Sequence, residues 1–226
     1  MEPQPWAVIS GHTSVEQSKK LLEVVNKRLS TDYGLMINDP PVEKTDPKVI
    51  KSRLFNKGMK ENASIFQHTQ SWVVIAETLT GNGNRAYEYF RKFMPSAYNT
   101  KAEIRQTEPY VYAQFTNSVY SPRYGASRLP WLSGTASWAY YTAAQFILGI
   151  QPEYSGLKID PCIPSDWKEI NVSRKFRQKI FNITIKNETN VQKGVKKISI
   201  NGNEINGNII PSEQIQDTNE VLVFMG

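Results

Sequence analysis

Apolar residues recur at helical spacing in three stretches of the first 94 residues, whereas residues 38–46 and much of the segment up to Gly58 are expected to be loop. Residues 3–11 (PQPWAVISG) are predicted to form a turn followed by a buried entry to a helix. The first helix is expected to end near Ser30, and Thr13 and Glu16 fit a capping box at its start. Its expected apolar face consists of Val15, Leu22, Val25 and Leu29.

Two further helices are predicted on either side of a break formed by Gly81 and Gly83. They cover residues 63–79 and 85–94, and Pro95 ends the second of them. Their expected inward residues are Ile65, Phe66, Thr69, Trp72, Val73, Ala76 and Leu79 in the former, and Tyr87, Phe90 and Met94 in the latter. A connection this short favours antiparallel packing of the two helices.

A helix entrance is predicted at Ser133-Gly134-Thr135. The preceding residues 108–115 (EPYVYAQF) are expected to form a helix or helical turn, and residues 116–132 a loop. From Thr135 the spacing is helical as far as Gly149. Unpaired backbone N–H groups at a helix start attract anions, so Ser133 and Gly134 form a candidate phosphate cradle. The alternative is an ordinary cap with no ligand.

Beyond Gly149 the pattern changes to the alternation of apolar and polar residues that is typical of strands. The clearest strands are residues 157–159, 179–186, 198–200 and 221–223. The Asn-Gly pairs at 201–202 and 206–207 favour turns. We therefore predict an α+β chain with a helical domain at residues 1–155 and a small antiparallel β domain at residues 156–226.

The composition is that of a globular protein. The 226 residues are 39% hydrophobic, no apolar run is long enough to cross a bilayer, and no signal peptide opens the chain. A single cysteine, Cys162, excludes an internal disulfide and agrees with a cytoplasmic location. The net charge of +6 favours anionic small molecules only loosely. The densest basic run, Arg174 to Lys179, is interpreted as a solvated strand edge, and no nucleic-acid-binding module is recognisable.

Few residues are candidates for chemistry. His12 is expected to be a surface or capping residue, whereas His68 lies on the inward side of an apolar helix. His68 is either a core histidine or a ligand. A metal site is not expected, because no second histidine or cysteine stands at ligand spacing, and Cys162 has no base nearby in sequence.

Two other segments carry polar side chains that suit a sugar. Lys60 and Glu61 precede the helix that contains His68, where Glu61 could also simply favour the helix N-terminus. Glu108 and Gln114 lie in a segment rich in aromatic residues, and aromatic faces beside amides and carboxylates suit pyranose rings. The alternative is an ordinary packing seam.

Five segments in order along the chain resemble the inverting disaccharide phosphorylases, the family of the cellobiose and chitobiose phosphorylases. They are residues 6–11 (WAVISG), 58–77 (GMKENASIFQHTQSWVVIAE), 108–115 (EPYVYAQF), 130–138 (PWLSGTASW) and 147–167 (ILGIQPEYSGLKIDPCIPSDW). Within the family, the run YSPRYGASRLPWLSG at residues 120–134 is most similar to the cellobiose phosphorylase branch.

The resemblance implies that this chain is a C-terminal fragment, holding the last helices of an (α/α)6 barrel and a C-terminal β domain. It places His68, Ser133 and Gly134 on phosphate, and Gln114, Lys60 and Glu61 on the sugar, with Glu108 a weaker assignment from adjacency. The family's general acid, an aspartate, would lie upstream of Met1, so no catalytic residue is assigned here.

The implied reaction is the phosphorolysis of cellobiose to α-glucose 1-phosphate and glucose. No cofactor is expected, phosphate being a substrate, and family members are often homodimers. Two alternatives stay open. One is an inactive sugar-binding or structural remnant. The other is a sister activity on chitobiose, a cellodextrin or laminaribiose.

Overall fold

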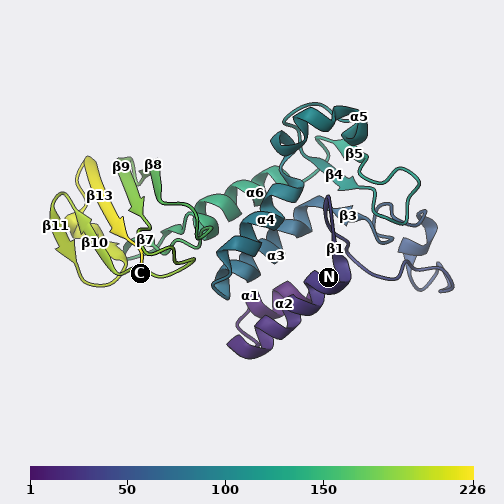
Figure 1. Cartoon of the computed structure of the whole chain (residues 1–226), viewed down its shortest axis with the longest axis horizontal. Helices are drawn as coiled ribbons and strands as arrows, with labels where there is room; N and C mark the ends of the chain where they lie inside the picture. The colour runs from purple at the N-terminus through teal and green to yellow at the C-terminus, as the bar shows by residue number, and fades with distance from the viewer. The chain divides into compact units, whose positions relative to one another are not determined.

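The computed structural model describes all residues 1–226 and divides the chain into two compact units (Figure 1). The helical unit consists of residues 1–80 and 88–140, and the sheet unit consists of residues 81–87 and 141–226. The mixture of helices and strands is compatible with the predicted α+β class. The (α/α)6 barrel and the domain boundary at residue 155 stay predictions. No helix is both long enough and apolar enough to span a bilayer.

Two N-terminal helices differ in detail from the prediction. Residues Pro3–Ile9 form a helix, α1, rather than a turn. Helix α2, Val15–Leu29, ends where expected, but Ser14 and Gln17 form its capping box, not Thr13 and Glu16. The Thr13 hydroxyl instead hydrogen-bonds the Ser18 hydroxyl at 2.8 Å. Of the predicted apolar face, Leu22, Val25 and Leu29 are buried and Val15 is exposed.

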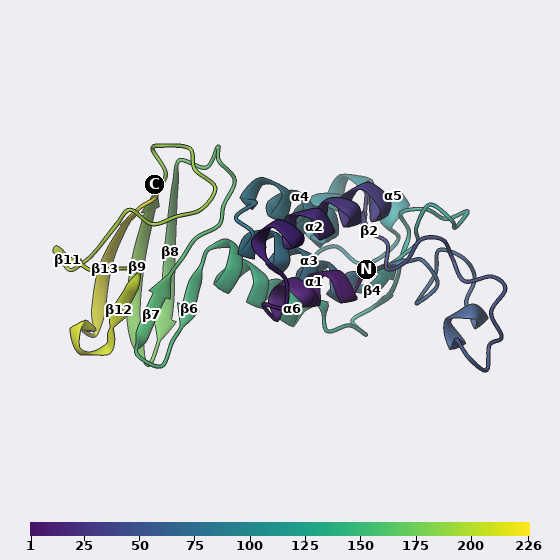
Figure 2. The same ribbon diagram turned by 90° about the horizontal axis from the view of Figure 1, so that it is seen from below.

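Helix α3, Gln67–Leu79, carries the candidate residue His68 in its first turn. Residues Ile65–Phe66, which were predicted to begin this helix, form the short strand β3. Thr69, Val73 and Ala76 are fully buried as predicted, whereas Leu79 is exposed. Helix α3 packs on α1 and α2, and Figure 2 shows the three side by side.

Helix α4, Gly83–Phe93, begins two residues earlier than predicted and passes from the sheet unit into the helical unit. Its buried apolar side chains are Ala86, Tyr89, Phe90 and Phe93. The predicted inner residues Tyr87 and Met94 are half-buried, so only Phe90 was placed correctly.

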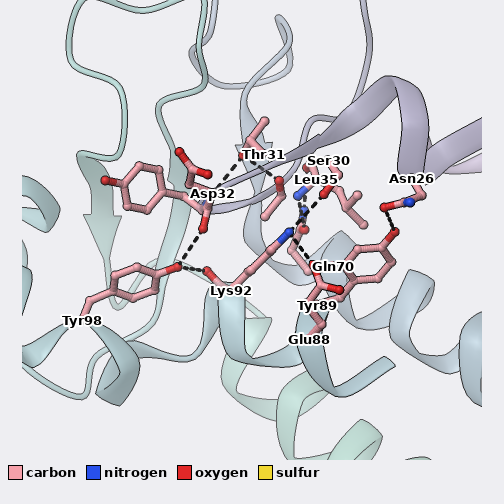
Figure 3. A network of polar contacts seen from close by, with 12 residues as sticks. Asn26, Ser30, Thr31, Asp32, Leu35, Gln70, Glu88, Tyr89, Lys92 and Tyr98 are labelled. Atoms are coloured by element: carbon pink, nitrogen blue, oxygen red, sulfur yellow. Dashed lines mark hydrogen bonds and ion pairs between the residues drawn. The ribbon is translucent and has the colours of Figure 1, made fainter. Parts of the chain in front are cut away.

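A hairpin follows α2 and is fastened to the helices by polar contacts (Figure 3). Its strands are β1, Ser30–Thr31, and β2, Gly34–Leu35. Lys92 Nζ donates to Ser30 Oγ at 3.1 Å, and the Tyr98 hydroxyl donates to the Lys92 carbonyl at 2.5 Å. Burial raises the pKa of the Tyr98 hydroxyl. At neutral pH it therefore stays protonated and able to donate.

The segment between β2 and β3 is mostly loop, as predicted, with one 3₁₀ turn, η1, at Lys51–Leu54. A second 3₁₀ segment, η2, covers Pro95–Lys101 and leads into the short helix α5, Ala102–Arg105. Arg105 donates to the carbonyls of Glu108 and Val111, which fixes the start of the next segment.

A three-stranded antiparallel sheet replaces the helix expected at residues 108–115. Strand β4, Ala113–Thr116, pairs with β3 on one side and with β5, Ser127–Pro130, on the other. Gln67 secures the pairing, because its amide donates to Thr116 Oγ1 at 2.8 Å and accepts from the Ala113 N–H at 3.2 Å. Strand β5 lies within the predicted loop at residues 116–132.

Helix α6, Thr135–Thr142, begins where predicted and continues as a π-helical segment, η3, over Ala143–Ile147. Gly149 follows with a positive φ of 68°. A Cβ there would lie 2.1 Å from the Asp160 carbonyl, so glycine is required at this position.

The sheet unit contains a three-stranded sheet in the order β12-β7-β6 and a five-stranded sheet in the order β11-β10-β13-β9-β8. The three-stranded sheet consists of β6 (Ile150–Pro152), β7 (Gly156–Ile159) and β12 (Ile209–Pro211). The larger one consists of β8 (Glu169–Phe176), β9 (Lys179–Lys186), β10 (Lys197–Ile200), β11 (Asn203–Ile205) and β13 (Thr218–Phe224). A 3₁₀ turn, η4, covers Ser212–Gln214.

The predicted strands are confirmed, but the prediction of a purely antiparallel domain is wrong. Strand β13 pairs with β9 in parallel along its whole length, from Thr218 opposite Ile180 to Phe224 opposite Lys186. The basic run at residues 174–179 ends β8 and starts β9 across the two-residue turn Arg177-Gln178, where both residues have positive φ.

Candidate functional site

The three-stranded sheet brings three predicted site segments together. His68 follows β3, Gln114 lies in β4, and Ser133 follows β5 by three residues. The Thr135 hydroxyl, at the start of α6, donates to the Ala113 carbonyl at 3.5 Å and so connects the helix entrance to β4. Residues separated by up to 65 positions are therefore held by one small element.

His68 is half-buried between two aromatic rings. Its ring lies 5.1 Å from the Phe66 ring and 5.2 Å from the Trp72 ring, both edge to face. Burial lowers the pKa of His68, and the negative charge of Glu2 opposes this only in part. In the ligand-free protein, the His68 side chain is therefore neutral down to a lower pH than the side chain of an exposed histidine. The structure gives it no hydrogen-bond partner that would account for a purely structural role.

Ser133 forms a local turn immediately before α6, whose first residue is Thr135. Ser133 Oγ accepts from the Thr135 N–H at 3.1 Å and pairs with the Thr135 hydroxyl. Gly134 is exposed, and a Cβ placed there would meet only Trp138 Cδ1, at 3.9 Å. The backbone at Gly134 is thus open to a ligand.

A row of aromatic rings connects His68 with this helix entrance. Trp72 lies 5.2 Å from His68 and 5.8 Å from Trp138, whose ring borders Gly134. Trp6 of α1 packs edge to face on Trp72 at 5.4 Å. The indole N–H of Trp72 is buried without a partner. This row fixes α3, which carries His68, against α6, which directly follows Ser133 and Gly134.

The predicted sugar-binding residues are brought together only in part. Lys60 Nζ donates to Gln114 Oε1 and lies 5.9 Å from the centre of the Phe115 ring. Glu61 is exposed and forms no hydrogen bond or ion pair with either. Glu108 Oε1 instead accepts from the indole N–H of Trp131 at 3.2 Å. Lys60 and Gln114 therefore form one pair, and Glu108 belongs to a second pair near the helix entrance.

Strained backbone surrounds these residues, and no motif in the sequence indicates it. Lys60, Ala63, Leu129 and Trp131 all have positive φ, between 50° and 69°. Such angles are uncommon for residues other than glycine and gather at functional sites. A positive φ can be predicted from sequence mainly where glycine stands, and none of these four positions is glycine.

Ala63 provides a test of this strain. Its φ is 61° and it is fully buried. Replacing it with glycine is expected to leave the free energy of unfolding unchanged or to raise it by up to about 1 kcal/mol, because relief of the left-handed strain offsets the added freedom of the unfolded chain. The matched control is Ala76→Gly within α3, which should cost about 1 kcal/mol. Urea unfolding measures both, and equal losses in the two variants would refute the interpretation.

The comparisons with known proteins identify the family. Residues 1–149 match the model described as the glycosyl hydrolase 94 superfamily, catalytic domain. The chain belongs to this superfamily.

Among characterised relatives, the N,N'-diacetylchitobiose phosphorylases of Vibrio proteolyticus and Vibrio furnissii are 38% and 34% identical over all 226 residues. A solabiose phosphorylase of Paenibacillus borealis is 30% identical over 211 residues, 93% of this chain. The chain spans 28% of the length of each. These relatives agree with the broad resemblance to disaccharide phosphorylases but not with the narrower one to the cellobiose branch.

Among solved structures, a family GH92 α-mannosidase from Bacteroides thetaiotaomicron aligns with 99% of this chain and 23% of its own. The TM-score is 0.36 and the identity 12%.

Proposed function

We propose that this chain supplies phosphate-binding and sugar-binding residues to an inverting phosphorylase that cleaves a β-linked disaccharide. The observation that carries the proposal is the convergence of His68, Gln114 and the Ser133-Gly134 entrance around one sheet, in a chain of the glycosyl hydrolase 94 superfamily. His68 and the N–H groups at the start of α6 would hold phosphate, and Lys60 and Gln114 would contact the sugar.

The chemistry needs these groups because phosphate takes the place of the activated water in an inverting hydrolase. A phosphate oxygen forms a bond to the anomeric carbon on the face opposite the leaving sugar, and the glycosidic C–O bond breaks. The leaving oxygen takes a proton from a general acid that lies outside this chain. Phosphate is already anionic, so the protein's task is to hold it in line rather than to deprotonate it.

The proposal includes two candidate disaccharide substrates. The run at residues 120–134 favours cellobiose, whereas the two Vibrio relatives are named for N,N'-diacetylchitobiose. Cellobiose would give α-glucose 1-phosphate and glucose, and N,N'-diacetylchitobiose the corresponding N-acetylglucosamine products. The pair formed by Lys60 and Gln114 suits the ring hydroxyls that both substrates share.

A chimera tests the function. In it, this chain replaces the matching 28% of the Vibrio proteolyticus relative, and phosphate-dependent release of sugar 1-phosphate is measured on cellobiose, N,N'-diacetylchitobiose and laminaribiose. We expect activity on at least one disaccharide and none from the 226-residue chain alone. A folded but inactive chimera would favour the structural remnant, and activity of the isolated chain would refute an external general acid.

Gln114→Ala in the same chimera separates the two parts of the site. The KM for the disaccharide should rise about tenfold, since a polar contact to the sugar is lost, while the KM for phosphate should stay nearly unchanged. A change confined to phosphate would contradict the assignment of Gln114.

A further inference from the structure

A groove of about 500 Å³ in the helical unit takes no part in the proposed reaction. It is bordered by the segment before Lys60 and by the loop between β4 and β5, with Met59, Asn117, Tyr120, Arg123 and Arg128 among its lining residues. None of the residues assigned to phosphate or to the disaccharide lines it. Its size is within the range of small-molecule sites.

Gly58 allows the two walls of the groove to approach each other. Its φ is 76°, and a Cβ there would lie 2.7 Å from the Ser121 backbone nitrogen. The Ser118 N–H donates to the Gly58 carbonyl at 3.0 Å. These main-chain contacts thus fix the position of the segment at Gly58 relative to the loop between β4 and β5.

The charge of the groove is positive and largely unpaired. The Arg123 guanidinium forms no ion pair or hydrogen bond. Arg128 donates only to neutral groups, the Ser127 carbonyl at 2.8 Å and Gln106 Oε1 at 3.1 Å. Lys57 is paired with Glu43 at 2.7 Å, and no acidic residue lines the groove. Two arginines are therefore available to an anion.

A buried amide adds a second, independent sign of a ligand. Asn117 is 1% exposed and lines the groove, yet its side-chain oxygen has no partner. A buried polar atom left unpaired costs about 1–3 kcal/mol, so a hydroxyl donor from a ligand would be favourable there. Tyr120, Met59 and Pro122 offer the apolar contact that one face of a sugar ring requires.

We propose that this groove binds a monosaccharide that carries an anionic group, either a carboxylate or a phosphate. The two arginines hold the anion, the Asn117 amide accepts from a ring hydroxyl, and the Tyr120 ring packs on the sugar. Neutral sugars lack the charge-assisted contacts and bind more weakly.

The test measures binding of glucuronate, glucose 6-phosphate and glucose to the 226-residue chain by ligand-observed NMR and calorimetry. At least one anionic sugar should bind about tenfold or more tightly than glucose, since charged hydrogen bonds are worth roughly twice neutral ones. The comparison of glucuronate with glucose 6-phosphate shows which anion is preferred. Equal binding of glucose, or no binding of either anionic sugar, would overturn the proposal.

Variants locate the binding. Arg123→Gln should weaken it several-fold without disturbing the fold, because this exposed side chain forms no hydrogen bond or ion pair with the rest of the protein. Arg123→Gln combined with Arg128→Gln should abolish it, whereas Arg91→Gln, an exposed arginine on α4, should have no effect. Unchanged affinity in Arg123→Gln would contradict the proposal. His68→Ala should leave this binding intact, so the groove and the proposed phosphorylase site can fail separately.

Discussion

Replacing Gln70 with methionine is expected to lower the free energy of unfolding by about 2–4 kcal/mol, because two buried backbone groups lose their partner. Gln70 Oε1 accepts from the Leu35 N–H at 2.7 Å, and its Nε2 donates to the Leu35 carbonyl at 2.9 Å (Figure 3). Both residues are fully buried, so water cannot easily replace these bonds. Methionine keeps the volume of the side chain and removes only the hydrogen bonds.

Urea unfolding followed by tryptophan fluorescence measures this loss. Lys19→Met, on the exposed face of α2, is the control and should change stability by no more than about 0.5 kcal/mol. A cost of Gln70→Met as small as that of the control would mean that the hairpin does not depend on this amide. Because Gln70 lies two residues after His68, the substitution also tests whether the hairpin steadies the start of α3.

Replacing His68 with alanine is the functional change with the largest expected effect. In the chimera, the KM for phosphate should rise roughly tenfold to a hundredfold, since a charge-assisted contact to a buried anion is worth about 1.5–3 kcal/mol. The disaccharide KM should change little. Ser133→Ala should have a smaller effect, about 1 kcal/mol, because the Gly134 N–H and the helix end remain.

The pH dependence of phosphate binding follows from the surroundings of His68. Burial lowers the pKa of the free imidazole, and a bound dianion would raise it again, so binding takes up a proton. Affinity should therefore increase as the pH falls through the histidine range and decrease as it rises. Sulfate, whose charge is constant there, is the competing ligand of choice. The same pH dependence in His68→Ala would show that another group is responsible.

The same lowered pKa has a consequence for stability. The unfolded chain, with an ordinary histidine, binds a proton more readily than the folded chain. The contribution of neutral His68 is thus fully present above the ordinary histidine pKa, and it is lost as the pH falls from there through the lowered pKa of the folded chain.

The sequence by itself determined those elements whose pattern is local and long. The strand at residues 179–186 was predicted to the residue, and α2 ends where its apolar spacing ends. The helix entrance at Thr135 was also correct, because Pro130 and the following spacing leave few alternatives. His68 was found as a candidate because the polar residue interrupts an apolar face.

Only the tertiary structure decided the elements that depend on distant partners. Residues 113–116 are a strand because β3 and β5 pair with them, although the spacing of Val111 and Phe115 equally fits one face of a helix. Strand β13 pairs with β9 in parallel. The alternation of apolar and polar residues in these two segments would be the same for an antiparallel pair, so the sequence does not specify the direction. The positive φ of Ala63 and Trp131 has the same origin. Strain at residues other than glycine is imposed by packing around them, which a linear pattern does not record.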